Sequence, residues 1–139
     1  SKDLEAWTVL PPLSEPDAGF AHLEVPQLLT LDGQDLLVFS CDAPALVGRR
    51  AGARGGVWAL PVDAPTGSLR TAGAELVIDE SHYAGRITHD RDGRSVLLAF
   101  HNRADGDELP GIISDPIPVR WDPVEARIRV EMEYETDRV

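Results

Sequence analysis

Two strand–turn–strand patterns, about 60 residues apart, constrain the fold of this chain more than any other feature. One turns at Asp32-Gly33 and the other at Asp92-Gly93, and Asp-Gly is typical of tight hairpins because it tolerates positive φ. The runs that follow, residues 36–39 and 96–100, are apolar on both strand faces. Both strands must therefore be covered on both sides, as in stacked propeller blades or in the inner layers of a sandwich.

The rest of the chain also favours strands over helices. It contains 12 Gly and 11 Pro, and nowhere does an apolar 3.6-residue period persist for three turns. We therefore predict an all-β fold. The expected strands are residues 23–31, 35–41, 56–62, 75–79, 117–122 and 127–134, with a second hairpin over 83–101 and a turn over 102–111.

The two hairpins resemble one pattern written twice. If they are repeats, Glu24 and Tyr83 begin equivalent strands, within one residue of each other in register. The innermost strands of a propeller line its central channel. We therefore expect the Glu24 and Tyr83 side chains to face one cavity.

Charge and composition limit the partners. The 139-residue chain has a formal net charge of −11, which argues against nucleic acid and suits either a neutral sugar or plain solubility. No stretch approaches the ~20 apolar residues of a membrane span, so no membrane partner is expected. Cys41 is the only cysteine and is expected to be a buried thiol rather than a nucleophile. The sequence favours neither a cytoplasmic nor a secreted location.

Glu24 is the main candidate for chemistry. It stands among apolar residues at the start of a strand, and Pro26 cannot donate a ladder hydrogen bond. Partly apolar surroundings raise the pKa of a carboxyl group, which suits such a group to general acid catalysis. The alternative is that Glu24 pairs with an arginine or caps a turn.

Other polar residues allow two interpretations each. His22 and His82 lie beside the expected cavity and either bind substrate or serve the structure, and the four histidines form no ligand cluster. We predict no required metal and no cofactor. The loop 42–55 carries Arg49, Arg50 and Arg54, and is expected to be a mobile surface excursion, or alternatively a lid or phosphate contact.

Three short segments resemble glycoside hydrolase family 32, the invertase and fructanase family. Residues 23–28, Leu-Glu-Val-Pro-Gln-Leu, are similar to its Glu-Cys-Pro-Asp-Leu motif. Tyr83-Ala84 resembles its Asp-x-Tyr-Ala segment, and residues 92–100 resemble its Asp-Gly-Arg-(apolar)-Gly-Trp segment. These matches occur in the family's order within residues 1–122.

The resemblance implies that Glu24 is the general acid/base and that Tyr83 and Phe100 shape the sugar pocket. It implies that residues 1–139 form about two to three antiparallel four-stranded blades of a five-bladed β-propeller, with no second domain. A missing N-terminal half or a second copy would then complete the ring. Four departures put the sugar in question: Val25 for Cys, Gln27 for Asp, Ser81 for an acidic residue and Phe100 for Trp.

The family's nucleophile motif, Asn-Asp-Pro-Asn, is absent, and so is its Arg-Asp-Pro motif. Retaining glycosidases need two carboxyl groups about 5–5.5 Å apart. Asp32, Asp90, Asp92 and Asp115 are available, but the first three belong to expected turns away from Glu24.

The sequence therefore predicts part of a retaining, β-fructofuranosidase-like glycoside hydrolase acting on fructose-containing glycosides. Its nucleophile would come from about 150 residues preceding Ser1. The alternative is a non-catalytic carbohydrate-binding or structural propeller fragment.

Overall fold

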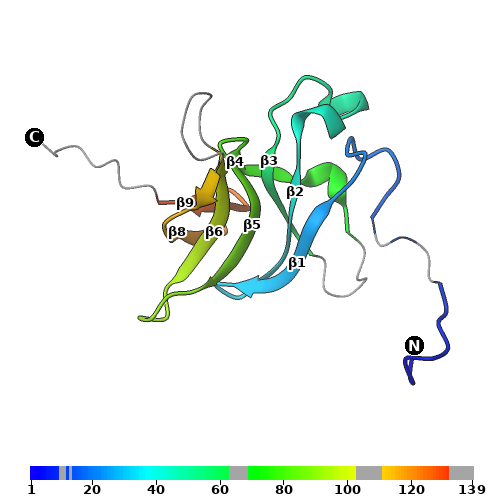
Figure 1. Ribbon diagram of the computed structural model, residues 1–139, viewed down its shortest axis with the longest axis horizontal. Coiled ribbons are helices and arrows are strands. Elements are labelled where there is room, and N and C mark those ends of the chain that lie inside the picture. The colour runs from blue at the N-terminus through cyan, green and yellow to red at the C-terminus, as the bar shows by residue number, and fades with distance from the viewer. Residues whose placement is uncertain (10–11, 13, 63–68, 103–110, 132–139) are drawn as a thin grey trace, which may run out of the picture.

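The computed structural model describes residues 1–9, 12, 14–62, 69–102 and 111–131, which form two antiparallel β-sheets (Figure 1). The first sheet has the order β1 (Glu24–Leu31), β2 (Gln34–Cys41), β3 (Gly56–Pro61), β4 (Glu75–Asp79). The second has the order β5 (His82–His89), β6 (Ser95–Asn102), β8 (Ile117–Asp122), β9 (Arg127–Val130), with β7 (Gly111–Ile113) also paired to β6. The helical turns are η1 (Ala43–Ala45), η2 (Gly48–Arg50) and η3 (Thr71–Gly73). None of these turns in the described ranges is long and apolar enough to cross a membrane.

The all-β prediction is confirmed, and the two sheets pack against each other as a sandwich around one shared core. Each sheet follows chain order, as a propeller blade does. Two sheets in the described ranges do not make a five-bladed ring, so a propeller stays a prediction for a larger assembly. The second sheet also has five strands rather than four. Asp115 and Pro116 separate β7 from β8, and Pro116 has no N–H for the ladder.

The predicted hairpins are confirmed almost to the residue. Asp32 and Gly33 have φ of 51° and 85° between β1 and β2, as a two-residue hairpin turn requires. The β5–β6 turn has Gly93 at φ 79°, and the Asp90 carboxylate accepts hydrogen bonds from the N–H groups of Asp92 and Arg94. The sequence patterns missed β7. Most of the turn expected over 102–111, and the end of the strand expected over 127–134, lie outside the described residues.

Covering of both faces is confirmed for β2 but not for β6, where Leu98 is partly exposed and Phe100 is 40% exposed. In β2, Leu36 and Val38 face the core between the sheets, where they meet Ile87 and Leu97 of the second sheet. On the other face, Leu37, Phe39 and Cys41 form a second core with Trp58 and residues of the connecting segments. All five of these β2 side chains are at most 4% exposed. This double burial explains why the strand does not alternate between apolar and polar residues.

The loop 42–55 is neither a free excursion nor a lid, because Arg50 ties it to the second core. The guanidinium lies 4.5 Å from the Phe20 ring centroid and 4.7 Å from that of Trp58. It donates hydrogen bonds to the carbonyl oxygens of Ala18, Ala72 and Ala74. Because three carbonyl oxygens and two aromatic rings already contact the Arg50 guanidinium, Arg50 stabilises the loop and is not a phosphate contact.

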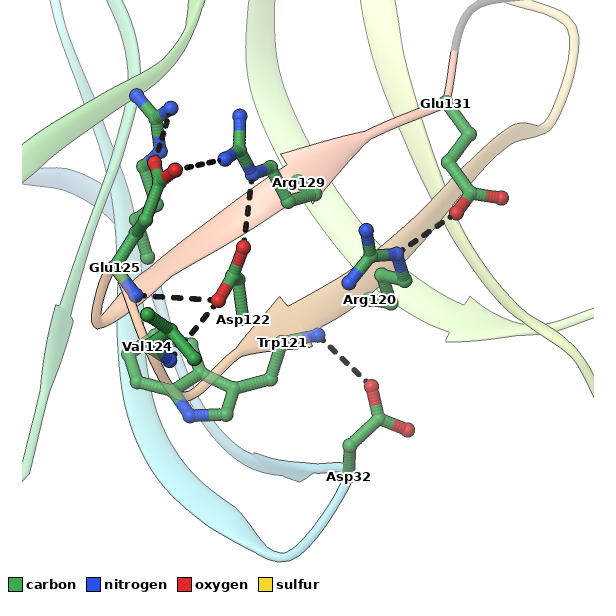
Figure 2. A network of polar contacts seen from close by, with 9 residues as sticks. Asp32, Arg120, Trp121, Asp122, Val124, Glu125, Arg129 and Glu131 are labelled. Atoms are coloured by element: carbon green, nitrogen blue, oxygen red, sulfur yellow. Dashed lines mark hydrogen bonds and ion pairs between the residues drawn. The ribbon is translucent and has the colours of Figure 1, made fainter.

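A polar network joins the β8–β9 hairpin to the β1–β2 turn (Figure 2). The Asp32 carboxylate accepts a 2.8 Å hydrogen bond from the Trp121 N–H, joining the β1–β2 turn to β8. Asp122 accepts from the N–H groups of Val124 and Glu125 and from Arg129, and the Glu125 N–H and then Arg129 hold the pKa of Asp122 below its usual value. Asp32 and Asp122 therefore have structural roles.

Gln27 joins the two sheets rather than lining a pocket. Its side-chain amide donates to the Ile87 carbonyl at 2.8 Å, and its oxygen accepts from the Ile87 N–H at 2.9 Å. The Gln27 side-chain amide makes the same pair of hydrogen bonds that a neighbouring strand would make. It therefore pairs both the N–H and the carbonyl oxygen of Ile87. This accounts for glutamine at a position where the resembled motif has aspartate.

We expect Gln27→Ala to lower the free energy of unfolding by about 1–3 kcal/mol, since it leaves two partly buried backbone groups unpaired. Urea unfolding followed by circular dichroism measures this change. The matched control is Gln34→Ala, because the Gln34 side chain bonds only the adjacent, exposed Asp35 carbonyl. Equal losses for the two variants would show that Gln27 does not bridge the sheets.

Gly85 lets β5 approach the first sheet closely. A Cβ at this position would lie 2.8 Å from Val57 Cγ2 and 2.9 Å from Leu97 Cδ1. We expect Gly85→Ala to destabilise the fold by about 1–3 kcal/mol through overpacking. A Cβ at Gly73 meets nothing within 4 Å, so Gly73→Ala is the control, and thermal unfolding compares them. Unchanged stability in Gly85→Ala would contradict this packing.

Candidate active site

The candidate site begins with two matching irregularities in the backbone. The β1–β2 register shifts between Glu24 and Gln27, and the β5–β6 register shifts between Tyr83 and Arg86. The residues just after Glu24 and Tyr83 both have positive φ, 44° for Val25 and 54° for Ala84. A positive φ is costly for a β-branched residue such as Val25, and strain of this kind clusters at functional sites. The repeat predicted from sequence is therefore present in the structure, with Glu24 and Tyr83 at equivalent positions.

The side chains of these two residues meet. The Tyr83 hydroxyl donates a 2.6 Å hydrogen bond to Glu24 Oε2. Burial raises the pKa of Tyr83, and the bond to Glu24 and the negative charge of Glu24 raise it further. Tyr83 therefore stays protonated at neutral pH and holds one carboxylate oxygen in place, while the Glu24 side chain remains 50% exposed.

His22 links Glu24 to a second carboxylate. Its Nε2 lies 3.7 Å from Glu24 Oε1 and 3.4 Å from Asp42 Oδ1. The four side chains of Tyr83, Glu24, His22 and Asp42 thus form a continuous chain of polar contacts from β5 to the end of β2. His22 thus stands between two carboxylates at a site open to solvent.

A cavity of about 310 Å³ adjoins this chain of contacts. It has the size of a small ligand pocket and combines carboxylates with an aromatic face, as sites for sugars do. Phe100 lies directly opposite Tyr83 in the β5–β6 ladder and is 40% exposed. The residues that line the cavity are Glu24, Asp42, Glu80, Tyr83, Phe100 and Asn102.

The predicted residues separate into two groups. Glu24, Tyr83 and Phe100 share the cavity, and His22 contacts Glu24. His82 is not among the lining residues. Its ring is buried, stacks on His101 at 4.6 Å and bonds the Ser81 hydroxyl, and burial, then the charge of His101, lowers its pKa. This environment favours the structural interpretation of His82.

Sequence reasoning missed three lining residues, Asp42, Glu80 and Asn102. Two of them, Asp42 and Asn102, could have been predicted from the repeat. Ser40 pairs with Glu24 and Phe100 pairs with Tyr83, so Asp42 and Asn102, each two residues further along, occupy equivalent positions. The register of the two hairpins was therefore a usable signal. Glu80 lies in the connection between the sheets and carried no comparable signal.

The chain belongs to the family described as the β-xylosidase C-terminal concanavalin A-like domain, whose model matches residues 12–139. This agrees with the glycoside hydrolase resemblance of the sequence motifs and with the sandwich of two sheets.

One solved structure supports the fold. It is a glycoside hydrolase family 32 protein from Bifidobacterium adolescentis, with a TM-score of 0.50 and 18% sequence identity. The match covers 81% of this chain and 19% of that chain, so this chain corresponds to about a fifth of that protein. No curated protein matches the chain. Neither comparison bears on the sugar or on the role of Glu24, which stay predictions.

Proposed function

We propose that this chain is part of a retaining glycoside hydrolase acting on fructose-containing glycosides, with Glu24 as the general acid/base. The observation that carries the proposal is the 2.6 Å hydrogen bond from Tyr83 to Glu24 at the mouth of the shared cavity. Glu24 protonates the leaving oxygen and then takes a proton from the incoming water. Tyr83 holds the other carboxylate oxygen and fixes its direction.

We place the nucleophile outside this chain because the Asn-Asp-Pro-Asn motif of the resembled family is absent from it. Asp32 bonds Trp121 in the β1–β2 turn, Asp90 shapes the β5–β6 turn, and neither lines the cavity. Asp42 does line it, but its oxygen already lies within 3.4 Å of His22 Nε2. A carboxylate from a further blade, across the cavity from Glu24, would complete the pair that retention requires.

A non-catalytic carbohydrate-binding domain is the second candidate. The family description, a C-terminal concanavalin A-like domain of β-xylosidases, favours it. In that case Tyr83, Phe100 and Glu24 bind a sugar without cleaving it. Binding would then persist when the Glu24 carboxylate is replaced by an amide of the same shape.

A substrate panel with the intact protein separates the candidates. We expect hydrolysis of sucrose or fructans, little hydrolysis of aryl β-xylosides, and fructose released first with the anomeric configuration of the substrate, as seen by proton NMR. Binding without hydrolysis would favour the non-catalytic domain. Inversion at the anomeric carbon, or cleavage of xylosides alone, would contradict the proposed function.

A further inference from the structure

A cluster of three different metal-ligand side chains, His22, Cys41 and Asp42, shares two members with the chain of contacts at Glu24. His22 precedes β1, and Cys41 and Asp42 stand at the end of the neighbouring strand β2. Because β1 and β2 are antiparallel, with Glu24 opposite Ser40, their ends bring these residues together. One ligand atom from each, a His22 ring nitrogen, Cys41 Sγ and an Asp42 oxygen, lies within 4.8 Å of the others.

From this geometry we infer that His22, Cys41 and Asp42 form a binding site for Zn²⁺. Thiolate sulfur, imidazole nitrogen and carboxylate oxygen together are the ligand set that zinc takes in proteins, and Mg²⁺ or Ca²⁺ would not select the sulfur. The site does not depend on the proposed glycosidase function.

The distances fit a tetrahedral ion with small side-chain movements. Zinc bonds of about 2.0–2.1 Å to nitrogen and oxygen place two such ligands about 3.3–3.4 Å apart. His22 Nε2 and Asp42 Oδ1 are 3.4 Å apart. Cys41 Sγ lies within 4.8 Å of the other two ligand atoms, against about 3.5–3.6 Å in a tetrahedral zinc site, so it must move by at most about 1.3 Å.

Charge and access also favour a cation here. Glu24 and Asp42 bring two carboxylates to His22, and Asp42 lines the open cavity, so an ion arrives from the solvent side. Cys41 is fully buried, and its thiol proton leaves to solvent as the sulfur–zinc bond forms.

The test is a titration of the intact protein with zinc chloride by calorimetry, repeated with cadmium chloride by ultraviolet absorption. We expect one ion per chain at this site and a thiolate-to-cadmium charge-transfer band. Cys41→Ser should abolish the band and weaken zinc binding at least about tenfold. His22→Gln should weaken binding similarly while the thiol remains.

The matched control is His89→Gln, an exposed histidine at the far end of β5, which should bind as the unchanged protein does. Cys41 is buried, so His22→Gln, at a half-exposed position, keeps the test valid if Cys41→Ser does not fold. Absence of the cadmium band in the unchanged protein would overturn the inference. So would zinc binding that His22→Gln leaves unaltered.

Discussion

Glu24→Gln in the intact protein is expected to lower sucrose or fructan turnover about 10²–10⁴-fold, the usual worth of a positioned general acid. Glutamine keeps the shape of the side chain and can still accept the hydrogen bond from Tyr83. It has no proton to give to the leaving oxygen and cannot accept one from water. The loss should therefore appear in kcat, while substrate binding stays close to that of the unchanged protein.

Two companion variants make the Glu24 result specific. Glu75→Gln removes the same charge from an exposed strand start that does not line the cavity, and should leave turnover unchanged. Tyr83→Phe removes the hydrogen bond to Glu24 but keeps the ring, and should cause a smaller loss than Glu24→Gln. Full turnover in Glu24→Gln would remove this residue from catalysis.

Arg50→Ala is expected to lower the free energy of unfolding by about 2–4 kcal/mol, because the substitution removes three charge-assisted hydrogen bonds and two cation–π contacts at once. The carbonyls of Ala18, Ala72 and Ala74 lose their donor, and Phe20 and Trp58 lose the group between them. Chemical unfolding measured by tryptophan fluorescence reports this directly, since Trp58 is one of the rings.

The neighbouring residue supplies the control for Arg50. Arg49 carries the same charge in the same helical turn but is exposed, so Arg49→Ala should change stability by less than about 0.5 kcal/mol. Arg50→Lys keeps the charge without the planar fork and should fall between the two. Equal stability of the Arg49 and Arg50 variants would show that the loop is not held in this way.

Local patterns were sufficient to predict most strands of this fold. The Asp32-Gly33 turn is specified by two adjacent residues, and the doubly apolar strand after it required cover on both faces. The same repeat predicted that the Glu24 and Tyr83 side chains face one cavity. Each of these inferences depends on residues close in sequence or on one pattern that occurs twice.

Contacts between distant segments were not predictable in this way. Nothing in the sequence distinguishes Arg50 from other loop arginines, because its contacts with Phe20 and Trp58 exist only in the folded chain. Gln27 looked like a lost sugar contact because its partner, the Ile87 backbone, lies 60 residues away. The cluster of His22 with Cys41 required the pairing of β1 with β2, which fixes which strand ends are neighbours.

The leaving-group dependence of Glu24→Gln tests the central claim most directly. A general acid matters most for a poor leaving group such as the glucose of sucrose, and little for an acidic phenol. We predict a large loss on sucrose and a loss at least about tenfold smaller on an aryl fructoside with an acidic phenol. Equal losses on the two substrates would contradict the assignment of Glu24 as the proton donor.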